Sequence, residues 1–341
     1  MSMKFDTEIS KQQFGFKSEE TLPGFSSFDV AVDLGNRSDI HPLAVKTDID
    51  SGHVFESDFL SVLQLWWEWH DTSSPLHISG PAGCGKTTTV LQFLARVNMP
   101  AVNITCRQSM DMSDLLGRWG TSDMGPKWYE GPLTVAWKYG YTLVINEFSL
   151  APAHVWVALN DIFEGGELPV DALGASIAKH PNTRIVITDN CRALDISRDY
   201  IGRRPQDLTS AERFWHFEAH WPEEGQEKVL LKEKAVLVAG KRASNVPEET
   251  DRLIEAALAF AGQTREDALN PEKPIGQRLP AISTRVLIRF VELTVAMICA
   301  ERFCQTSVLD RALKLAIAKG LSPQKETMLL DLMHAHFDRL V

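Results

Sequence analysis

Nine residues, from Gly80 to Thr88, constrain this chain more than any other part of its sequence. They read Gly-Pro-Ala-Gly-Cys-Gly-Lys-Thr-Thr and satisfy the phosphate-loop pattern G-x-x-x-x-G-K-[ST] in full. The apolar run at 76–79 before them is typical of a buried strand, and apolar residues recur at helical spacing over 88–97. A strand, a loop and a helix in this order favour a phosphate-binding loop over a chance glycine-rich turn.

The residue types in the loop suit the phosphates of a nucleotide. Glycines at 80, 83 and 85 allow backbone conformations that turn N–H groups toward phosphate oxygens at the N-terminus of a helix. Lys86 supplies a positive charge to the β- and γ-phosphates, and Thr87 supplies a hydroxyl to Mg²⁺. We therefore predict a nucleotide site made of Gly80, Pro81, Ala82, Gly83, Cys84, Gly85, Lys86, Thr87 and Thr88.

A second stretch, 141–147, is an apolar strand pattern that ends in Asn146 and Glu147. In a P-loop ATPase the corresponding strand delivers a ligand for a Mg²⁺-bound water and then a carboxylate that orients the attacking water. Glu147 is predicted to take the second role. Asn146 stands where Asp is usual, so we expect weaker metal binding and slower turnover, because an amide oxygen brings no negative charge. The alternative is that Asn146 only caps the strand.

Another buried strand pattern, at 183–190, ends in Asp189 and Asn190. Ligands of doubly wound sheets bind outside the carboxyl ends of the strands, and Asn190 is predicted to lie at the same sheet edge as Glu147. Asn190 is therefore a candidate for contact with the γ-phosphate or with the attacking water.

Shorter patterns complete the predicted secondary structure. Strands are expected at 101–105 and 214–217, helices at 56–70, 113–117, 130–139 and 151–163, hairpin arms at 165–170 and 175–178, and a loop insertion between 117 and 126. The remainder is expected to be helical over 226–241, 248–261, 283–303, 308–318 and 324–339.

These elements predict an α/β fold, a P-loop NTPase αβα sandwich with a parallel sheet, followed by a smaller all-helical domain. The predicted divisions are an N-terminal arm at 1–50, the nucleotide-binding domain at 51–221 and the helical domain at 222–341. Aromatic residues in the arm, such as Phe14, favour docking on a surface over a disordered tail.

Composition excludes some classes of protein. The formal net charge of −10 argues against broad nucleic-acid binding, although a local basic groove would not show in the total. The five cysteines include no C-x-x-C pair, which suggests neither a disulfide framework nor a zinc ribbon and fits a reducing cytoplasm. No apolar run approaches the ~18 residues that span a bilayer, and the N-terminus lacks the pattern of a signal peptide.

Two clusters have alternative interpretations. Trp66, Trp67 and Trp69 could form a platform for adenine, but a tryptophan stripe at helical spacing is more typical of a core. His216, Glu218 and His220 contain metal-ligating types, but their order is not that of H-E-x-x-H, so a strand face is favoured over a metal site.

Together these stretches resemble the AAA+ ATPases, and within them the MoxR-like branch that includes the CobS subunit of aerobic cobaltochelatase. The likeness extends over most of the chain, with Gly80 to Thr88 as Walker A, Leu143 to Glu147 as Walker B and Asn190 as sensor 1. Arg213 falls where the family has its arginine finger, and Arg285 looks like the family's sensor 2.

The resemblance implies a ring, with a hexamer expected, in which ATP lies between the αβα domain and a helical lid. Arg213 and Arg285 are implied to be catalytic together with Glu147 and Asn190, and Thr87 and Asn146 are implied to bind the metal. Arg213 is implied to act on the ATP of the neighbouring subunit. Whether Arg203 or Arg204 shares this task is left open.

Family members commonly act on a partner that carries a von Willebrand factor A domain, as remodelling or metal-insertion chaperones. The resemblance therefore favours an ATPase motor that remodels a protein partner. A nucleotide-gated assembly switch that hardly turns over is the first alternative, because of Asn146. A DNA-directed motor is the second, because Lys179, His180 and Arg184 lie near the predicted hairpin.

Overall fold

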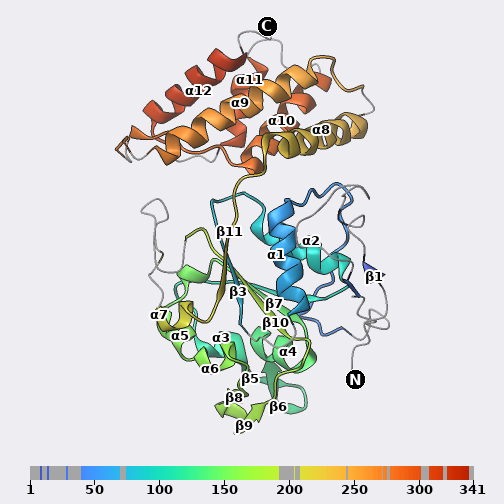
Figure 1. The fold of residues 1–341 in the computed structure, drawn as a ribbon, viewed down its shortest axis with the longest axis vertical. Coiled ribbons are helices and arrows are strands. Elements are labelled where there is room, and N and C mark those ends of the chain that lie inside the picture. Colours follow the sequence, from blue (N-terminus) through green and yellow to red (C-terminus); the bar gives the residue numbers. More distant parts are fainter. Residues whose placement is uncertain are drawn as a thin grey trace. The chain divides into compact units, whose positions relative to one another are not determined.

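The structure, a computed structural model, describes residues 8–9, 14, 28–29, 40–69, 74–191, 203, 208–242, 245–270, 272–274, 277–300, 307–317 and 321–337. The chain divides into two compact units (Figure 1). The α/β unit comprises Met1–Pro81 and Gly85–His220, and the helical unit comprises Ala82–Cys84 and Trp221–Val341.

A five-stranded parallel sheet forms the centre of the described part of the α/β unit (Figure 1). In spatial order its strands are β11 (Trp215–Glu218), β3 (Leu76–Ser79), β10 (Arg184–Thr188), β7 (Thr142–Asn146) and β4 (Ala101–Thr105). Every residue of β3, β7 and β10 is buried, which explains why these strands read as nearly continuous apolar runs. All five predicted strands are confirmed, with their ends placed to within two residues.

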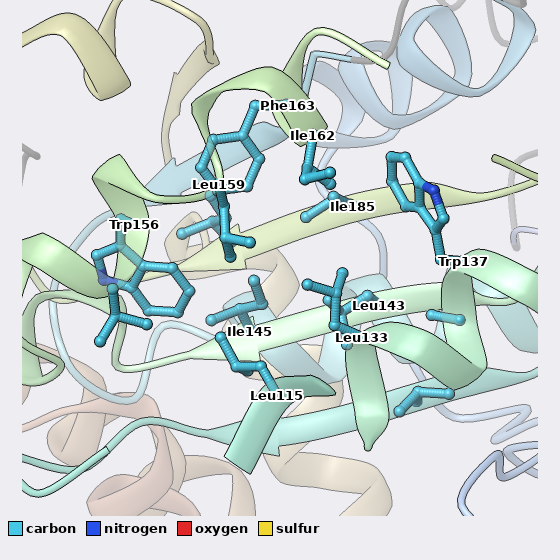
Figure 2. Packing of buried hydrophobic residues seen from close by; sticks show 14 of the residues in the cluster. Leu115, Leu133, Trp137, Leu143, Ile145, Trp156, Leu159, Ile162, Phe163 and Ile185 are labelled. Atoms are coloured by element: carbon cyan, nitrogen blue, oxygen red, sulfur yellow. The ribbon is translucent and has the colours of Figure 1, made fainter. Parts of the chain in front are cut away.

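Helices pack around this sheet. They are α1 (Ser57–Glu68), α2 (Lys86–Arg96), α3 (Met112–Leu116), α4 (Pro132–Tyr139), α5 (Ala153–Val157), α6 (Asn160–Phe163) and α7 (Leu208–Ala211). Figure 2 shows how Trp137, Trp156 and neighbouring aliphatic side chains pack over Ile145 of β7 and Ile185 of β10. Trp66 and Trp67 of α1 are buried and belong to a core, whereas Trp69, which follows the helix, is exposed.

Two predictions for this unit are wrong. The stretch between 117 and 126 is not a loop, because β5 (Gly117–Ser122) and β6 (Gly125–Glu130) pair as an antiparallel hairpin with a two-residue turn. The single helix expected at 151–163 is divided into α5 and α6, preceded by a 3₁₀ turn, η3 (Phe148–Leu150). The division lets the Asn160 side chain accept a hydrogen bond from Ser210 Oγ at 2.7 Å, so tertiary contacts override the helical spacing.

The hairpin expected before β10 is confirmed as β8 (Leu168–Val170) and β9 (Ala175–Ile177), joined through η4 (Asp171–Leu173). Trp119 Nε1 of β5 donates a hydrogen bond to Ala172 O at 3.1 Å. The two hairpins are therefore linked to each other. Near the N-terminus, β1 (Glu8–Ile9) pairs with β2 (Phe28–Asp29).

The helical unit contains α8 (Glu224–Lys241), α9 (Thr250–Leu269), α10 (Thr284–Cys299), α11 (Val308–Ala316) and α12 (Pro323–Phe337). Its core is aliphatic and aromatic, with Phe260, Phe290 and Phe337 buried. The five predicted helices are confirmed, although α9 continues to Leu269, past the predicted end at 261. No helix among the described residues is both long enough and apolar enough to span a bilayer.

A buried ion pair explains why the end of α9 was missed. Arg265 donates to both carboxylate oxygens of Glu227, at 2.9 and 2.7 Å, and Thr284 Oγ1 donates to Glu227 at 2.6 Å. Glu227 is 1% exposed. Because the inward face of this part of α9 carries an arginine in place of an apolar residue, it does not follow the usual helical pattern.

Two histidines face each other between β3 and β11. The Nδ1 atoms of His77 and His216 are 3.2 Å apart, and His216 Nε2 lies 2.9 Å from Ala211 O. A carbonyl only accepts, so His216 carries its proton on Nε2 and its Nδ1 accepts from His77. His77 Nε2 is buried and has no hydrogen-bond partner among the described residues. Burial, together with the neighbouring His216, lowers the pKa of His77 to about 3.

We expect this pair to make the α/β unit less stable in mild acid. The unfolded chain takes up a proton at His77 near pH 6.5, whereas the folded chain does so only near pH 3. Proton uptake by the unfolded chain therefore has no effect on stability well above pH 6.5. Below that pH it lowers the free energy of unfolding progressively, until the folded chain is protonated near pH 3. Between pH 7.5 and 5.5 the loss is about 1.4 kcal/mol of unfolding free energy.

Urea unfolding at the two pH values measures this effect. A His77→Gln variant keeps a donor for His216 but does not titrate, so its stability should fall by about 1.4 kcal/mol less than that of the native chain. An equal fall in both proteins contradicts the assignment to His77.

Candidate active site

Lys86 lies at the carboxyl edge of the sheet, where the phosphate loop joins α2. Its Nζ donates to Gly80 O and Pro81 O, both at 2.8 Å, and to Asn190 Oδ1 at 3.0 Å. Gly80 has φ 148°, and a Cβ on it would lie 2.2 Å from Ala219 O, so no larger residue fits. Gly85 begins α2 with φ 95°, a left-handed conformation that glycine adopts without strain.

Thr87 and Asn146 meet beside this lysine. Thr87 Oγ1 donates to Asn146 Oδ1 at 2.6 Å, and Thr188 Oγ1 donates to the same oxygen at 2.9 Å. Because the Thr87 hydroxyl donates its hydrogen bond to Asn146, the lone pairs of Thr87 Oγ1 are available to a cation. Mg²⁺ in nucleotide sites takes most of its ligands from phosphates and water, so the Thr87 hydroxyl fits as a protein ligand of Mg²⁺ bound together with a nucleotide, whereas the neutral Asn146 adds no carboxylate charge.

The amide group of Asn146 is held by β4. Its Nδ2 donates to Ile104 O at 2.9 Å and to the side chain of Asn103. This fixes the carbonyl oxygen toward Thr87. An aspartate at 146 would place a carboxylate oxygen against the Ile104 carbonyl, so the neutral residue matches its surroundings. Asn146 thus belongs to a network around the phosphate loop and does more than end a strand.

Glu147 follows directly and points its carboxylate at sensor candidate Asn190. Asn190 Nδ2 donates to Glu147 Oε1 and Oε2, both at 3.3 Å, while Asn190 Oδ1 accepts from Lys86. The Glu147 backbone is left-handed, with φ 56° and ψ 42°. A residue other than glycine is strained in this region by about 1 kcal/mol, and such strain collects at functional sites. Asn190 therefore joins Lys86 to Glu147.

Sequence reasoning missed a charged network beside Glu147. Asp189 is 2% exposed and accepts from Ser149 N at 2.6 Å, Ser149 Oγ at 3.0 Å and Asn190 N at 2.7 Å. Burial raises the pKa of Asp189, against the effect of these hydrogen bonds. Arg203 pairs with both Asp189 and Glu147. Asp189, which the sequence indicates only as a polar residue at the end of a strand pattern, thus belongs to the site.

Of the two other predicted arginines, Arg213 lies away from Lys86, whereas Arg285 lies beside Gly83 of the phosphate loop, where a Cβ on Gly83 would be 3.4 Å from Arg285 Cβ. Arg213 Nε pairs with Glu164 at 2.7 Å and is not among the residues gathered around Lys86. Arg285 is in the helical unit, at the start of α10, which Ser283 caps by accepting from Val286 N at 3.3 Å. Ala82 to Cys84 also group with the helical unit. Arg204 lies outside the described residues.

The alternative metal site is not supported. His216 is hydrogen-bonded to His77, and the described residues contain no cluster of three His, Cys, Asp or Glu side chains that could hold a metal ion.

A comparison with known protein families matches the part of the chain that contains Lys86, Glu147 and Asn190. A family model described as an AAA domain of the dynein-related subfamily matches residues 75–199. The chain is 31% identical to protein CbbQ of Hydrogenophilus thermoluteolus over 117 residues, 34% of this chain and 44% of that protein. It is 26% identical to protein NorQ of Paracoccus denitrificans over 266 residues, 77% of this chain and 86% of that protein.

A gas vesicle ATPase, GvpN1 of Halobacterium salinarum, is 28% identical over 203 residues, 51% of this chain and 57% of that protein. The match thus spans about half the length of CbbQ and GvpN1, and most of NorQ.

Among solved structures, the chain resembles the crystal structure of NtrX from Brucella abortus in complex with ADP. The TM-score is 0.50 at 14% identity, with 85% of this chain and 64% of that chain covered. At this identity the likeness concerns the fold alone. It agrees with the family match, and the predicted α/β fold of P-loop type with a helical C-terminal region is confirmed.

Proposed function

We propose that this chain, which resembles the AAA+ proteins of the MoxR-like kind, hydrolyses ATP with Mg²⁺ in order to remodel a protein partner. One observation carries the proposal. Lys86 of the phosphate loop is hydrogen-bonded to Asn190, which follows β10, and Thr87 to Asn146, which ends β7; Asn190 in turn donates to the Glu147 carboxylate. A loop that only binds phosphate does not need a carboxylate held in this place.

The roles of the residues follow from their chemistry. Lys86 binds the β- and γ-phosphates, and Thr87, with Asn146 behind it, binds Mg²⁺. When bound, the ion would neutralise negative charge on the phosphate oxygens. Glu147 accepts a hydrogen bond from the attacking water and takes its proton. Asn190 is hydrogen-bonded to both Lys86 and Glu147, so it fixes the position of Glu147 relative to Lys86. It also contacts the γ-phosphate or the attacking water.

Two arginines are proposed to complete the site. Arg213 is half-buried and pairs with Glu164 in its own chain, and we propose that it acts on the ATP of a neighbouring subunit in a ring, with a hexamer expected. Arg285 is proposed to reach the nucleotide from the helical unit as sensor 2. The phosphate-loop backbone, Gly80 to Thr88, wraps the phosphates.

A partner protein is proposed on family grounds and has a candidate surface. The linked hairpins expose large side chains, with Met124 99%, Trp119 54% and Tyr129 46% exposed. Exposed aromatic residues and methionine are typical of protein interfaces. A partner with a von Willebrand factor A domain, as in CobS-like chaperones, is the proposed class. The described cysteines are free thiols, which suits a cytoplasmic protein.

A mixing experiment tests the ATPase and the ring together. Glu147→Gln and Arg213→Ala subunits are each expected to be inactive alone. In a random mixture, about one site in four joins an intact Glu147 to an intact neighbouring Arg213, so ATP hydrolysis should return to about a quarter of the native rate. Phosphate release measures this recovery.

The matched control mixes Glu147→Gln with Lys86→Ala subunits. Both defects lie in the same half of the site, so no complete site forms and no activity returns. Hydrolysis by the native protein without recovery in the first mixture contradicts the role of Arg213 in trans. ATP-dependent ring assembly without any phosphate release by the native protein supports the alternative, a nucleotide-gated assembly switch, which the neutral Asn146 favours.

A further inference from the structure

Arg203 lies between the two carboxylates of the site. Its Nη2 pairs with Glu147 Oε2, and its Nη1 pairs with Asp189 Oδ1. Nη1 also donates to Ser149 Oγ at 2.8 Å. The Arg203 side chain is 6% exposed and the Asp189 side chain 1%, whereas Glu147 is 34% exposed and the most accessible member of the set. The guanidinium group thus links Glu147 to the buried carboxylate of Asp189.

The buried environment makes this contact a firm one. Burial lowers the pKa of Arg203, but an arginine stays charged in proteins, so its charge needs the two carboxylates. A planar guanidinium can serve both partners at once, which a lysine does not do as well. Asp189, itself held by Ser149 and by the Asn190 backbone, fixes one end of the fork.

The contact opposes the chemistry assigned to Glu147. To activate water, a carboxylate must offer a lone pair to the water and then accept its proton. A charged donor on Oε2 occupies a lone pair and favours the ionised form of the carboxylate, which makes it a weaker base. Asn190 already orients Glu147 through both of its oxygens, at 3.3 Å each, so Arg203 is not required for that purpose.

We propose that Arg203 is an inhibitory residue that restrains Glu147 through this ion pair and thereby keeps basal ATP hydrolysis slow. The inference rests on the proposed function. Arg203 would thus be a second feature, besides the neutral Asn146, that slows ATP hydrolysis. Asn146 acts on metal binding, whereas Arg203 acts on the Glu147 carboxylate. The residue therefore regulates Glu147 within its own chain.

The test compares steady ATP hydrolysis by the native full chain and by Arg203→Met, which has similar length but no donor. We expect kcat to rise on the order of tenfold, with KM for ATP unchanged, because Glu147 is released while the phosphate loop stays intact. Arg203→Lys keeps the charge but holds the two carboxylates less well than a guanidinium, so its kcat should lie between those of the native chain and Arg203→Met. Adding Glu147→Gln to Arg203→Met should remove the gain, since the effect acts through that carboxylate.

A matched control addresses the loss of a buried arginine. Arg96 is 8% exposed, and its guanidinium donates to backbone oxygens of Gln92 and Asp50 and to the Gln92 side chain. Arg96→Met should lower the thermal midpoint without raising kcat. If Arg203→Met destabilises the chain too far for assay, Arg203→Gln keeps one amide for Asp189 and should still raise kcat.

The outcomes are distinguishable. An Arg203→Met protein that folds and hydrolyses ATP at or below the native rate overturns the inhibitory role. No hydrolysis in the native chain, Arg203→Met or Arg203→Gln, although all three are folded and bind a fluorescent ATP analogue, contradicts the proposed function instead. A silent native chain with an active Arg203→Met variant supports both.

Discussion

Replacing Lys86 with alanine is expected to abolish ATP hydrolysis and to weaken ATP binding on the order of a hundredfold or more. Lys86 is 7% exposed and is held by the carbonyls of Gly80 and Pro81 and by Asn190, so its charge is aimed from within the loop. No other described lysine lies in this loop to replace it. Titration with a fluorescent ATP analogue measures binding, and phosphate release measures hydrolysis.

The control is another lysine of the α/β unit. Lys138 pairs with Glu130 at 2.7 Å on the surface of α4, and Lys138→Ala should bind and hydrolyse ATP as the native chain does. Native affinity in the Lys86→Ala variant would mean that nucleotide binds somewhere other than the loop.

Replacing Glu147 with glutamine is expected to lower kcat between a hundredfold and about ten-thousandfold while ATP binding is retained. Glutamine keeps an acceptor for Asn190 and the same length, but its amide does not take a proton from water. The left-handed backbone at 147 affects both residues equally, so the fold should not change. Binding and single-turnover hydrolysis separate the two steps.

Glu255→Gln is the matched control, because Glu255 forms only a surface pair with Lys228 in the helical unit among the contacts described, and its loss should leave kcat unchanged. Turnover at the native rate in Glu147→Gln would assign water activation to a different group. With ATP bound and hydrolysis blocked, this variant is also the form in which to capture a partner protein from solution.

The sequence predicts well those features whose cause is local. β3 and β7 are buried on both faces, so their apolar runs mark them, and the polar residues that follow mark the sheet edge where Asn146, Glu147 and Asn190 meet. The phosphate loop is constrained by glycines that a Cβ would block, as at Gly80. Site residues that are fixed by such short-range constraints can therefore be predicted from the sequence alone.

Features that depend on distant partners are not predicted. Arg203 is 56 positions from Glu147, and no spacing records that they pair. The hairpin at 117–130 was hidden because both strands are largely exposed and lack an alternating apolar pattern. The end of α9 was hidden by Arg265, whose inward position makes sense only beside Glu227.

The N-terminal residues have a consequence for self-association. β4 is an edge strand, and Val45 covers its start through an antiparallel bridge, with Val45 N 2.9 Å from Ala101 O. Phe14 is buried against Phe55 and Phe93. A chain shortened past residue 50 would bare this strand edge and an aromatic hollow, both of which invite pairing with another copy. Phe14 and Val45 thus cover apolar surface and a strand edge of the α/β unit, and both contacts oppose aggregation.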